Sequence, residues 1–435
     1  MSLSHQDSVR LFRNSAPYMN AHRGKVFVIM FGGEAVLSEN FDRLIQDIAL
    51  LHSLGIRIII VHGARPQIDE RLAFRSIQSQ FVDGLRITNK ATLECVKDAA
   101  GSLRSQIEAL LTLGLPNSPM HGARIRVCSG NLVIAKPLGV VNGIDFENTG
   151  SVRRIDVSGI QDQLNIGSIV LLSPMGYSPT GEVFNLSHED VATQAAISLK
   201  ADKLITLSEF DGIFQLQKLI RTIELDSLKP LIENKEIQAE STCLSAMIDT
   251  VAAGIDRAHC VSYHNDGALL KELFTRDGHG SLVMQTHYEQ LRTAIIDDVG
   301  GILNLIKPLE ESGVLLTRSR EKLENEIERF TVIERDGMTI ACAALYIFQE
   351  ERMAEVACVA IHRDYRGKHR GERLMQALKD KALDLNLTQL FVLTTVTSHW
   401  FLEQGFVEQS IEDLPRSKKD IYNFTRKSKV FVLPL

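Results

Sequence analysis

Four short runs of almost purely apolar residues constrain the fold of the longer, N-terminal part of the chain. Val, Ile and Leu dominate them, and they occupy residues 26–31, 56–63, 167–174 and 201–209. Runs of this kind predict strands that are covered on both faces. Because longer stretches with helical spacing separate the runs, the pattern from residue 25 to about 284 indicates a layered α/β structure with a largely parallel sheet.

The helices between these strands have recognisable ends. In the stretch SENFDRLIQDIALLHSLG, Ser38 is of a type that caps a helix N-terminus and Gly55 is of a type that ends a helix. We therefore expect a helix between them. A further helix is expected at about residues 4–18, where it covers its own sheet or pairs with another subunit. Its apolar side chains are Val9, Leu11, Phe12 and Tyr18.

The pattern changes in the C-terminal part of the chain. Residues 329–348 predict two antiparallel strands joined at Asp336-Gly337, a pair typical of a two-residue hairpin turn. A third strand, at 354–362, runs into a glycine-containing loop that opens a helix. A strand at 390–395 and a short helix that ends at Gly405 follow.

We expect the domain boundary between residues 285 and 293. The division that follows from it is an N-terminal helix at 1–24, an α/β domain at 25–286 and a second, mixed α/β domain at 287–435. A length of 435 residues leaves each domain room for a hydrophobic core of its own.

Composition excludes several classes of protein. Hydrophobic residues make up 44% and charged residues 23% of the chain, as is typical of globular proteins. The net charge of -6 comes without a dense basic run, which argues against nucleic acid as a partner. No apolar run approaches the roughly 18 residues that span a bilayer, and the polar start carries no secretory signal, so we expect a cytoplasmic protein without a membrane partner. The six cysteines are scattered without CxxC spacing, which predicts reduced thiols and no metal site.

A basic loop at residues 366–371 comes directly before the predicted helix of the C-terminal part. Arg366, Gly367 and Gly371 place free backbone N–H groups at the positive end of that helix, an arrangement that suits a pyrophosphate. Lys368 and Arg370 add positive charge. A solvated basic loop at a helix start fits the same spacing equally well, and spacing alone does not decide between the two.

The segment from about residue 300 to the end resembles the GNAT acetyltransferases. Their acetyl-CoA loop has the form Arg/Gln-x-x-Gly-x-Gly/Ala, and here it runs from Arg366 to Gly371 with His369 in place of the middle glycine. The resemblance implies a mixed α/β GNAT domain that takes acetyl-CoA as co-substrate and needs no other cofactor. It assigns acetyl-CoA binding to Cys358, Val359, Ala360, Arg366, Gly367, Lys368, His369, Arg370 and Gly371.

Direct attack of an amine on a thioester requires a base that accepts the proton of the ammonium group. Glu355 on the predicted strand is our candidate for this catalytic role, and an exposed strand residue without a role is the alternative. Cys358 as a covalent nucleophile is not favoured, because the sequence gives it no evident histidine partner. Phe401 occupies the position of the tyrosine that often protonates the leaving thiolate in this fold. The remaining proton donors are Thr394, which we select, Ser398, His399 and water.

Residues 25 to about 284 resemble the amino acid kinases, most closely N-acetylglutamate kinase. The stretches that carry the resemblance are VFVIMFGGEAV at 26–36, VHGARPQID at 61–69, RITN at 86–89 and FNLSHEDVA at 184–192. In the first loop Met30 replaces a lysine, and the later lysine of the kinases is absent as well. Phosphoryl transfer depends on cations that balance charge moving between phosphates, so we expect a domain without kinase activity. Glu34 in the same loop would repel a nucleotide.

The segment from residue 254 to 283 resembles the arginine-sensing end of arginine-inhibited N-acetylglutamate kinases. Position by position, the resemblance assigns arginine binding to Lys203, His259, Glu272 and Gly278. A carboxylate such as Glu272 can accept two hydrogen bonds from a guanidinium group. A surface helix with a glycine turn is the alternative for any one of these residues. In arginine-sensitive relatives an N-terminal helix builds a hexamer, so the resemblance implies a homo-hexamer.

The order of the two domains resembles the bacterial-type N-acetylglutamate synthases over essentially the whole chain. The implied reaction, the first of arginine biosynthesis, transfers acetyl from acetyl-CoA to L-glutamate, with L-arginine as feedback inhibitor. Arginine side chains suit the two carboxylates of glutamate, and the resemblance selects Arg318, Arg426 and Ser428 to bind it. The alternatives are an acetylglutamate kinase-type phosphotransferase and a non-catalytic arginine sensor.

Overall fold

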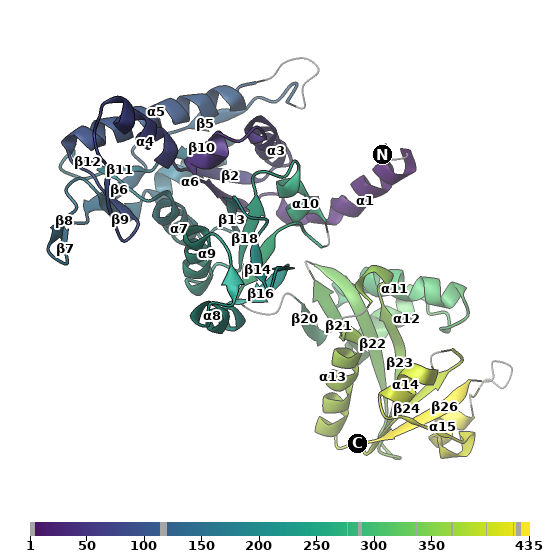
Figure 1. The fold of residues 1–435 in the computed structure, drawn as a ribbon. Helices are drawn as coiled ribbons and strands as arrows, with labels where there is room; N and C mark the ends of the chain where they lie inside the picture. The colour runs from purple at the N-terminus through teal and green to yellow at the C-terminus, as the bar shows by residue number, and fades with distance from the viewer. Residues whose placement is uncertain are drawn as a thin grey trace. The chain divides into compact units, whose positions relative to one another are not determined.

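The computed structural model describes residues 5–113, 120–275, 277–285, 289–335, 337–366, 369–396, 398–420, 422 and 428–435. The chain divides into two compact units, Met1–His287 and Tyr288–Leu435. Each unit has its own central sheet with helices packed on it (Figure 1). Within the described ranges, no helix combines the length and the apolar character that crossing a bilayer requires.

A mainly parallel sheet forms the centre of the first unit. Among the described residues its strand order is β16-β19-β18-β13-β1-β2-β10-β5, and within it β18 and β19 are antiparallel. These strands are β1 (Val26–Phe31), β2 (Arg57–His62), β5 (Arg126–Cys128), β10 (Ser168–Leu172), β13 (Lys203–Ser208), β16 (Thr222–Glu224), β18 (Arg257–Ser262) and β19 (Ser281–Met284). The four apolar runs of the sequence are the adjacent strands β13, β1, β2 and β10.

Shorter strands surround this sheet. The set β12-β11-β6-β9 forms a second sheet, made of β6 (Val133–Pro137), β9 (Gly150–Ile155), β11 (Met175–Tyr177) and β12 (Val183–Asn185). The remaining pieces are β3 (Gln80–Val82), β4 (Leu85–Ile87), β7 (Val140–Val141), β8 (Ile144–Asp145), β14 (Ile213–Gln215), β15 (Lys218–Ile220), β17 (Ile237–Gln238) and the one-turn helix α2 (Gly33–Val36).

Alternate side chains of β1 enter two separate cores. Phe27, Ile29 and Phe31 pack with α1 (His5–His22), α3 (Phe41–Ser53), α4 (Arg65–Phe74), α5 (Lys90–Leu111) and α10 (Ala268–Phe274). Val28 and Met30 pack with α6 (Val157–Asn165), α7 (His188–Leu199), α8 (Leu225–Glu233) and α9 (Ser241–Ala252). Helices therefore cover both faces of the sheet, and the predicted three-layer α/β architecture is confirmed.

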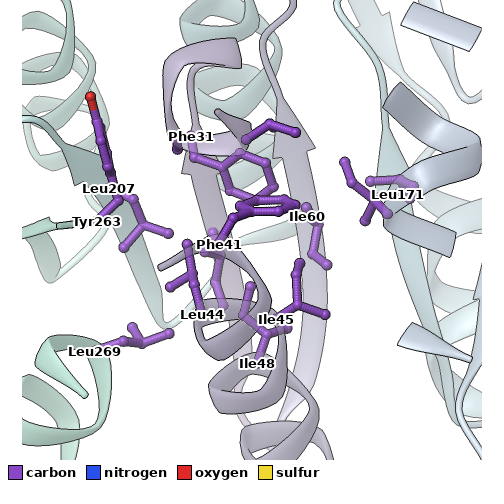
Figure 2. Packing of buried hydrophobic residues seen from close by; sticks show 14 of the residues in the cluster. Phe31, Phe41, Leu44, Ile45, Ile48, Ile60, Leu171, Leu207, Tyr263 and Leu269 are labelled. Carbon is purple, nitrogen blue, oxygen red and sulfur yellow. The ribbon is translucent and has the colours of Figure 1, made fainter. Parts of the chain in front are cut away.

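Figure 2 shows how α3 builds the first of these cores. The ring of Phe41 meets the ring of Phe31 from β1 edge-on, with centroids 5.6 Å apart. Leu44, Ile45 and Ile48 follow Phe41 at helical spacing and continue the buried face. The helical spacing of apolar residues from which this helix was predicted therefore matches the face that is buried.

Two helix ends differ from the prediction. Helix α3 begins at Phe41, because the Ser38 hydroxyl accepts a hydrogen bond from the Asn40 N–H at 3.3 Å in a turn before the helix. Its end is as predicted, since Gly55 follows it with a φ of +88°. Helix α1 extends beyond the predicted residue 18 to His22. Its last turn is held by a hydrogen bond of 2.9 Å between His22 Nε2 and the carbonyl of Leu273, a tertiary contact that local sequence does not reveal.

The second unit has a mixed sheet with the order β20-β21-β22-β23-β24-β26-β25 among its described residues. All neighbours in it are antiparallel except β23 and β24, which are parallel. Its strands are β20 (Gln290–Thr293), β21 (Phe330–Arg335), β22 (Met338–Phe348), β23 (Met353–Ile361), β24 (Gln389–Thr394), β25 (Val407–Gln409) and β26 (Lys429–Pro434).

Helices lie on both faces of this sheet as well. One face carries α13 (Arg370–Asp384) and α14 (Ser398–Glu403), and the other carries α11 (Val299–Glu311) and α12 (Arg320–Asn325). A short helix, α15 (Arg416–Lys419), comes before β26. The predicted strands and helix follow in the predicted order, which confirms a mixed α/β domain. Asp336 of the predicted hairpin turn lies outside the described residues.

Candidate functional site

The parallel pair β23 and β24 opens into a cleft between strands at Glu355. The two strands pair from Met353 to Glu355 on β23, and no further, although β23 continues to Ile361 and β24 to Thr394. On its other edge β23 stays paired with β22 as far as Ile361. The backbone of β23 beyond Glu355 therefore presents an edge with no strand partner among the described residues, which an extended ligand can pair with.

A β-bulge at Cys358 decides which side chains face this opening. Cys358 has a φ of +53°, and the pairing with β22 shifts register there. Ala354 and Val356 pack on the α13 face of the sheet, whereas Cys358 and Ala360 pack on the α11 face. Because the bulge shifts the alternation by one residue, Glu355 and Cys358 lie on the same face although they are three residues apart.

Glu355 is almost buried at this point. Its side chain is 12% exposed, and its Oε2 accepts a hydrogen bond of 2.6 Å from the Nζ of Lys418 in α15. Tyr346 is its register partner on β22 and donates its hydroxyl to Glu326 at 2.7 Å. Burial and the bond to Glu326 raise the pKa of Tyr346 to about 12, so this hydroxyl stays protonated at neutral pH.

Arg318 lies on the same side of the opening. Burial alone would lower the pKa of its guanidinium, but the neighbouring Cys358, Tyr346 and Glu355 outweigh burial and raise it. Its Nε atom is buried without a hydrogen-bond partner among the described residues. The structure thus holds a charged guanidinium with a free donor beside Glu355, as an anion-binding group requires.

The thiol of Cys358 is not set up as a nucleophile. Burial raises its pKa to about 11, and the nearby Arg318 only partly offsets this. A thiol with such a pKa is protonated at neutral pH and reacts slowly. This supports a role for the backbone of Cys358, and not for its thiol, in binding acetyl-CoA.

The predicted residues Thr394 and Ser428 meet at the far side of the opening. Thr394 ends β24, three residues beyond the partner of Glu355, and pairs in register with Lys429, which follows Ser428. Both are nearly buried. The Thr394 hydroxyl accepts a hydrogen bond of 3.3 Å from the Val396 N–H.

The basic loop is described in part. Gly367 and Lys368 lie outside the described residues, as does Arg426. Arg366 is exposed, and so is the His369 side chain, 3.5 Å from Glu372. His369 has a φ of +55°, in the left-handed region that glycine adopts without strain.

The side chain of Arg370 is engaged by residues of the second unit. It is buried, and its guanidinium bonds Glu289, with a further bond of 2.8 Å to the Tyr365 carbonyl. The charge that the sequence attributed to the loop at this position is therefore neutralised inside the unit. What Arg370 can offer an anion is its backbone N–H in the first turn of α13.

Gly371 has a packing role that its motif position does not reveal. A Cβ built there would lie 2.9 Å from Cζ2 of Trp400, a ring atom of α14 that would have to shift to make room. We expect Gly371→Ala to lower the free energy of unfolding by about 1–3 kcal/mol through this overlap. Thermal or urea unfolding measures the change.

The matched control is Gly300→Ala in α11, where an added Cβ meets nothing within 4 Å. Both substitutions introduce the helix propensity of alanine, so the difference between them isolates the contact with Trp400. Equal unfolding free energies for the two variants would contradict the packing role of Gly371.

A second site lies in the first unit, where the four residues predicted to bind arginine come together. Lys203 of β13 lies 3.4 Å from Nε2 of His259 on β18, and Nδ1 of His259 lies 2.7 Å from Oε1 of Glu272 on α10. Gly278 has a φ of +63°, and a Cβ there would lie 2.5 Å from Oε2 of Glu272. The glycine is therefore required for the close approach of backbone and carboxylate.

The pKa shifts of Glu272 and His259 fix the charges in this cluster. Burial pushes the pKa of Glu272 up, but bonds from His259 and from the backbone N–H groups of Gly280 and His279 outweigh it and hold the pKa at about 2. Burial and the nearby Lys203 lower the pKa of His259. A neutral imidazole then donates Nδ1–H to Glu272 and accepts from Lys203 at Nε2, so the cluster presents a fixed, buried carboxylate.

A separate cavity of about 550 Å³ lies where the predicted phosphate loop meets α4, α7 and α9. Met30 does not line it, because its side chain is fully buried in the core. Glu34, Glu189 and Glu240 do line it. Burial alone would lower the pKa of His188 beside them, but these three carboxylates outweigh burial and raise it. Arg65 and Arg86 line the cavity as well, but the carboxylates outnumber them, so the cavity disfavours a polyphosphate.

Tyr346, Glu326 and Lys418 belong to the first site and were missed by the sequence analysis. Tyr346 had a detectable signal, since it places a polar hydroxyl in the otherwise apolar run ACAALYIF. That run lies on the strand that pairs with Glu355. Lys418 had none, because it sits in the charged stretch RSKKD, which predicts a solvated surface.

Comparisons with known proteins identify the families that the two parts of the chain match. Residues 25–260 match the model of the amino acid kinase family, and residues 301–406 match that of the acetyltransferase (GNAT) family. The amino-acid acetyltransferase of Azotobacter vinelandii is 52% identical over 427 residues, 98% of this chain and 99% of that protein. That of Pseudomonas putida is 49% identical over 430 residues, 99% of this chain and 100% of that protein.

Solved structures of an N-acetylglutamate synthase are similar to this chain over nearly its full length. The N-acetylglutamate synthase of Neisseria gonorrhoeae complexed with coenzyme A and L-arginine has a TM-score of 0.89 at 35% identity, covering 98% of this chain and 99% of that one. The same enzyme complexed with coenzyme A and N-acetyl-glutamate has a TM-score of 0.61 at the same identity and coverage.

Proposed function

Because the chain belongs to the amino-acid acetyltransferase family, we propose that it transfers the acetyl group of acetyl-CoA to the α-amino group of L-glutamate. The products are CoA and N-acetyl-L-glutamate, and L-arginine inhibits the reaction. The observation that carries the proposal is the divergence of β23 and β24 at a nearly buried carboxylate, Glu355, with the charged Arg318 on the same side.

The opening between β23 and β24 can hold a thioester beside the bulge at Cys358. The free edge of β23 pairs with the pantetheine arm, and the backbone N–H groups of Cys358, Val359 and Ala360 polarise the thioester carbonyl. The phosphate end of acetyl-CoA meets the loop from Arg366 to Gly371. In this scheme the left-handed backbone at His369 keeps the loop open enough for phosphate to approach.

Glu355 accepts a proton from the α-ammonium group of glutamate, and the freed amine attacks the thioester carbonyl carbon. The C–S bond then breaks, and the thiolate takes a proton from Thr394 or a water molecule at the same place. Arg318 and Ser428, together with Arg426, bind the carboxylates of glutamate. The free Nε donor of Arg318 supports this role.

The first unit serves regulation in this proposal. Arginine binds at Lys203, His259, Glu272 and Gly278, where the fixed carboxylate of Glu272 takes the guanidinium group. The exposed side chains of Val9 and Phe12 on α1 are the surface through which we propose a homo-hexamer assembles. Acetyl-CoA and amino acids are substrates of central metabolism, so we place the reaction in the cytoplasm as the first step of arginine biosynthesis.

An assay of CoA thiol release tests the proposal against its two rivals. We expect release from acetyl-CoA that depends on L-glutamate and is suppressed by L-arginine, with no ATP consumed in the presence of N-acetyl-L-glutamate. ATP consumption without thiol release favours the phosphotransferase, which the three carboxylates of the cavity argue against. Arginine binding without either reaction favours the non-catalytic sensor.

A further inference from the structure

The ion pair between Lys418 and Glu355 is part of the folded core of the second unit. Their side chains are 18% and 12% exposed, and their charged atoms are 2.6 Å apart. Leu414, just before α15, packs among the buried side chains of β24 and β26. The Arg416 N–H bonds the carboxylate of Glu351 at 3.1 Å. Lys418 is therefore held beside the predicted base by the fold.

A pair of this kind is the electrostatic complement of an α-amino acid. The zwitterion carries an ammonium and a carboxylate on the same carbon, and an ammonium and a carboxylate side by side match it with all four charges alternating in sign. An incoming ammonium alone would meet the repulsion of Lys418 at short range, where two like charges interact strongly outside bulk water. The adjoining α-carboxylate removes that repulsion.

The remaining donors and acceptors fit this arrangement. The bond from Lys418 goes to Oε2 of Glu355, and Oε1 of Glu355 accepts no hydrogen bond from a described residue. Oε1 is thus available for the ammonium of the substrate. Arg318, with its unpartnered Nε on the same face, remains for a second carboxylate.

We propose that Lys418 binds the α-carboxylate of the amino acid substrate while Glu355 takes its ammonium group, so that Lys418 restricts acetylation to α-amino acids. This inference rests on the proposed acetyltransferase function. It assigns the α-carboxylate of glutamate to Lys418 and leaves the side-chain carboxylate to the residues already proposed for glutamate, Arg318 among them. A mostly buried ion pair contributes little net stability compared with apolar residues of the same size, so a substrate-binding role explains its presence better than stability does.

The experiment compares Lys418→Met with Lys419→Met in the same short helix. Lys419 pairs with Glu412 at 3.3 Å, and Glu412 is 87% exposed, so Lys419→Met is the matched control away from the opening. CoA release is measured with L-glutamate and with 4-aminobutyrate, which lacks the α-carboxylate. We expect Lys418→Met to raise KM for glutamate about 10–100-fold, the effect of losing one hydrogen bond to a charged group.

The KM for acetyl-CoA should stay within a factor of about three, and the preference for glutamate over 4-aminobutyrate should fall by the same factor as glutamate binding. Lys419→Met should match the parent in all of these. An unchanged KM for glutamate, or equal losses with both acceptors, overturns the inference, since Lys418 would then act only through Glu355 or through the fold.

Lys418→Gln keeps a hydrogen-bond donor and gives a second measurement if the methionine variant does not fold, which circular dichroism reveals. It should raise KM for glutamate less than Lys418→Met but in the same direction. A parent protein that releases no CoA with any α-amino acid refutes the proposed function together with this inference. An active parent with an insensitive Lys418 refutes the inference alone.

Discussion

Replacing Glu355 by Gln is expected to lower kcat for acetyl transfer to glutamate by about 10²–10⁴-fold, the usual contribution of a positioned general base. The amide keeps the shape of the side chain and an oxygen for Lys418, but it cannot accept the proton of the substrate ammonium. The KM for acetyl-CoA should change little, because acetyl-CoA is proposed to bind through backbone groups beyond Glu355. Steady-state kinetics with both substrates varied measure the two effects separately.

The matched control is Glu408→Gln on β25, which removes a carboxylate from an exposed ion pair with Lys429 in the same unit. Such surface pairs contribute about 1 kcal/mol or less, so this variant should keep its full turnover. Parallel losses of kcat and of acetyl-CoA binding in Glu355→Gln would show that the residue maintains the opening between the strands and does not act as a base.

Replacing Glu272 by Gln is expected to raise the arginine concentration needed for half-inhibition at least 10-fold while leaving kcat without arginine nearly unchanged. The reason is the pKa of about 2, which keeps the carboxylate charged at neutral pH and available to a guanidinium group. Glutamine is preferred to alanine here, because the N–H groups of His279 and Gly280 need an acceptor and would otherwise be buried unpaired.

Two further variants test whether the effect is specific to the Glu272 carboxylate. Lys271→Ala changes an exposed neighbour on α10 and should leave inhibition as it is. Gly278→Ala keeps the charge of Glu272 but places a Cβ 2.5 Å from its carboxylate oxygen, so it should weaken inhibition by displacing the group. Inhibition of Glu272→Gln at the parental arginine concentration would remove Glu272 from the arginine site.

Much of the fold followed from local pattern. The strands β1, β2, β10 and β13 lie within a residue or two of their predicted ends, because a run of Val, Ile and Leu can be buried on both faces only inside a covered sheet. Gly55 ended its helix as predicted because its left-handed conformation is a local property. Helix starts were less accurate, since the turn at Ser38 and the docking of His22 depend on neighbours.

The candidate sites were predictable to different degrees. Glu355, Arg318, Lys203, His259 and Glu272 were selected by resemblance, and the structure places each beside the others of its set. Arg370 and Gly371 belong to the same motif, yet the Arg370 side chain bonds Glu289 and the absence of a side chain at Gly371 makes room for Trp400. A motif gives the order of residue types along the chain. The direction in which each side chain points depends on residues far away in the sequence.

The sequence by itself determined the two α/β domains, the missing lysine at Met30 and the residue types available for chemistry, because each of these depends on order and spacing along the chain. Only the tertiary structure decided that β23 and β24 part at Glu355, that a bulge turns Cys358 to the same face, and that Lys418 lies against Glu355. The physical reason is that strand pairing and burial act between residues distant in sequence. A lysine 63 positions away carries no local sign that it will lie beside a nearly buried carboxylate.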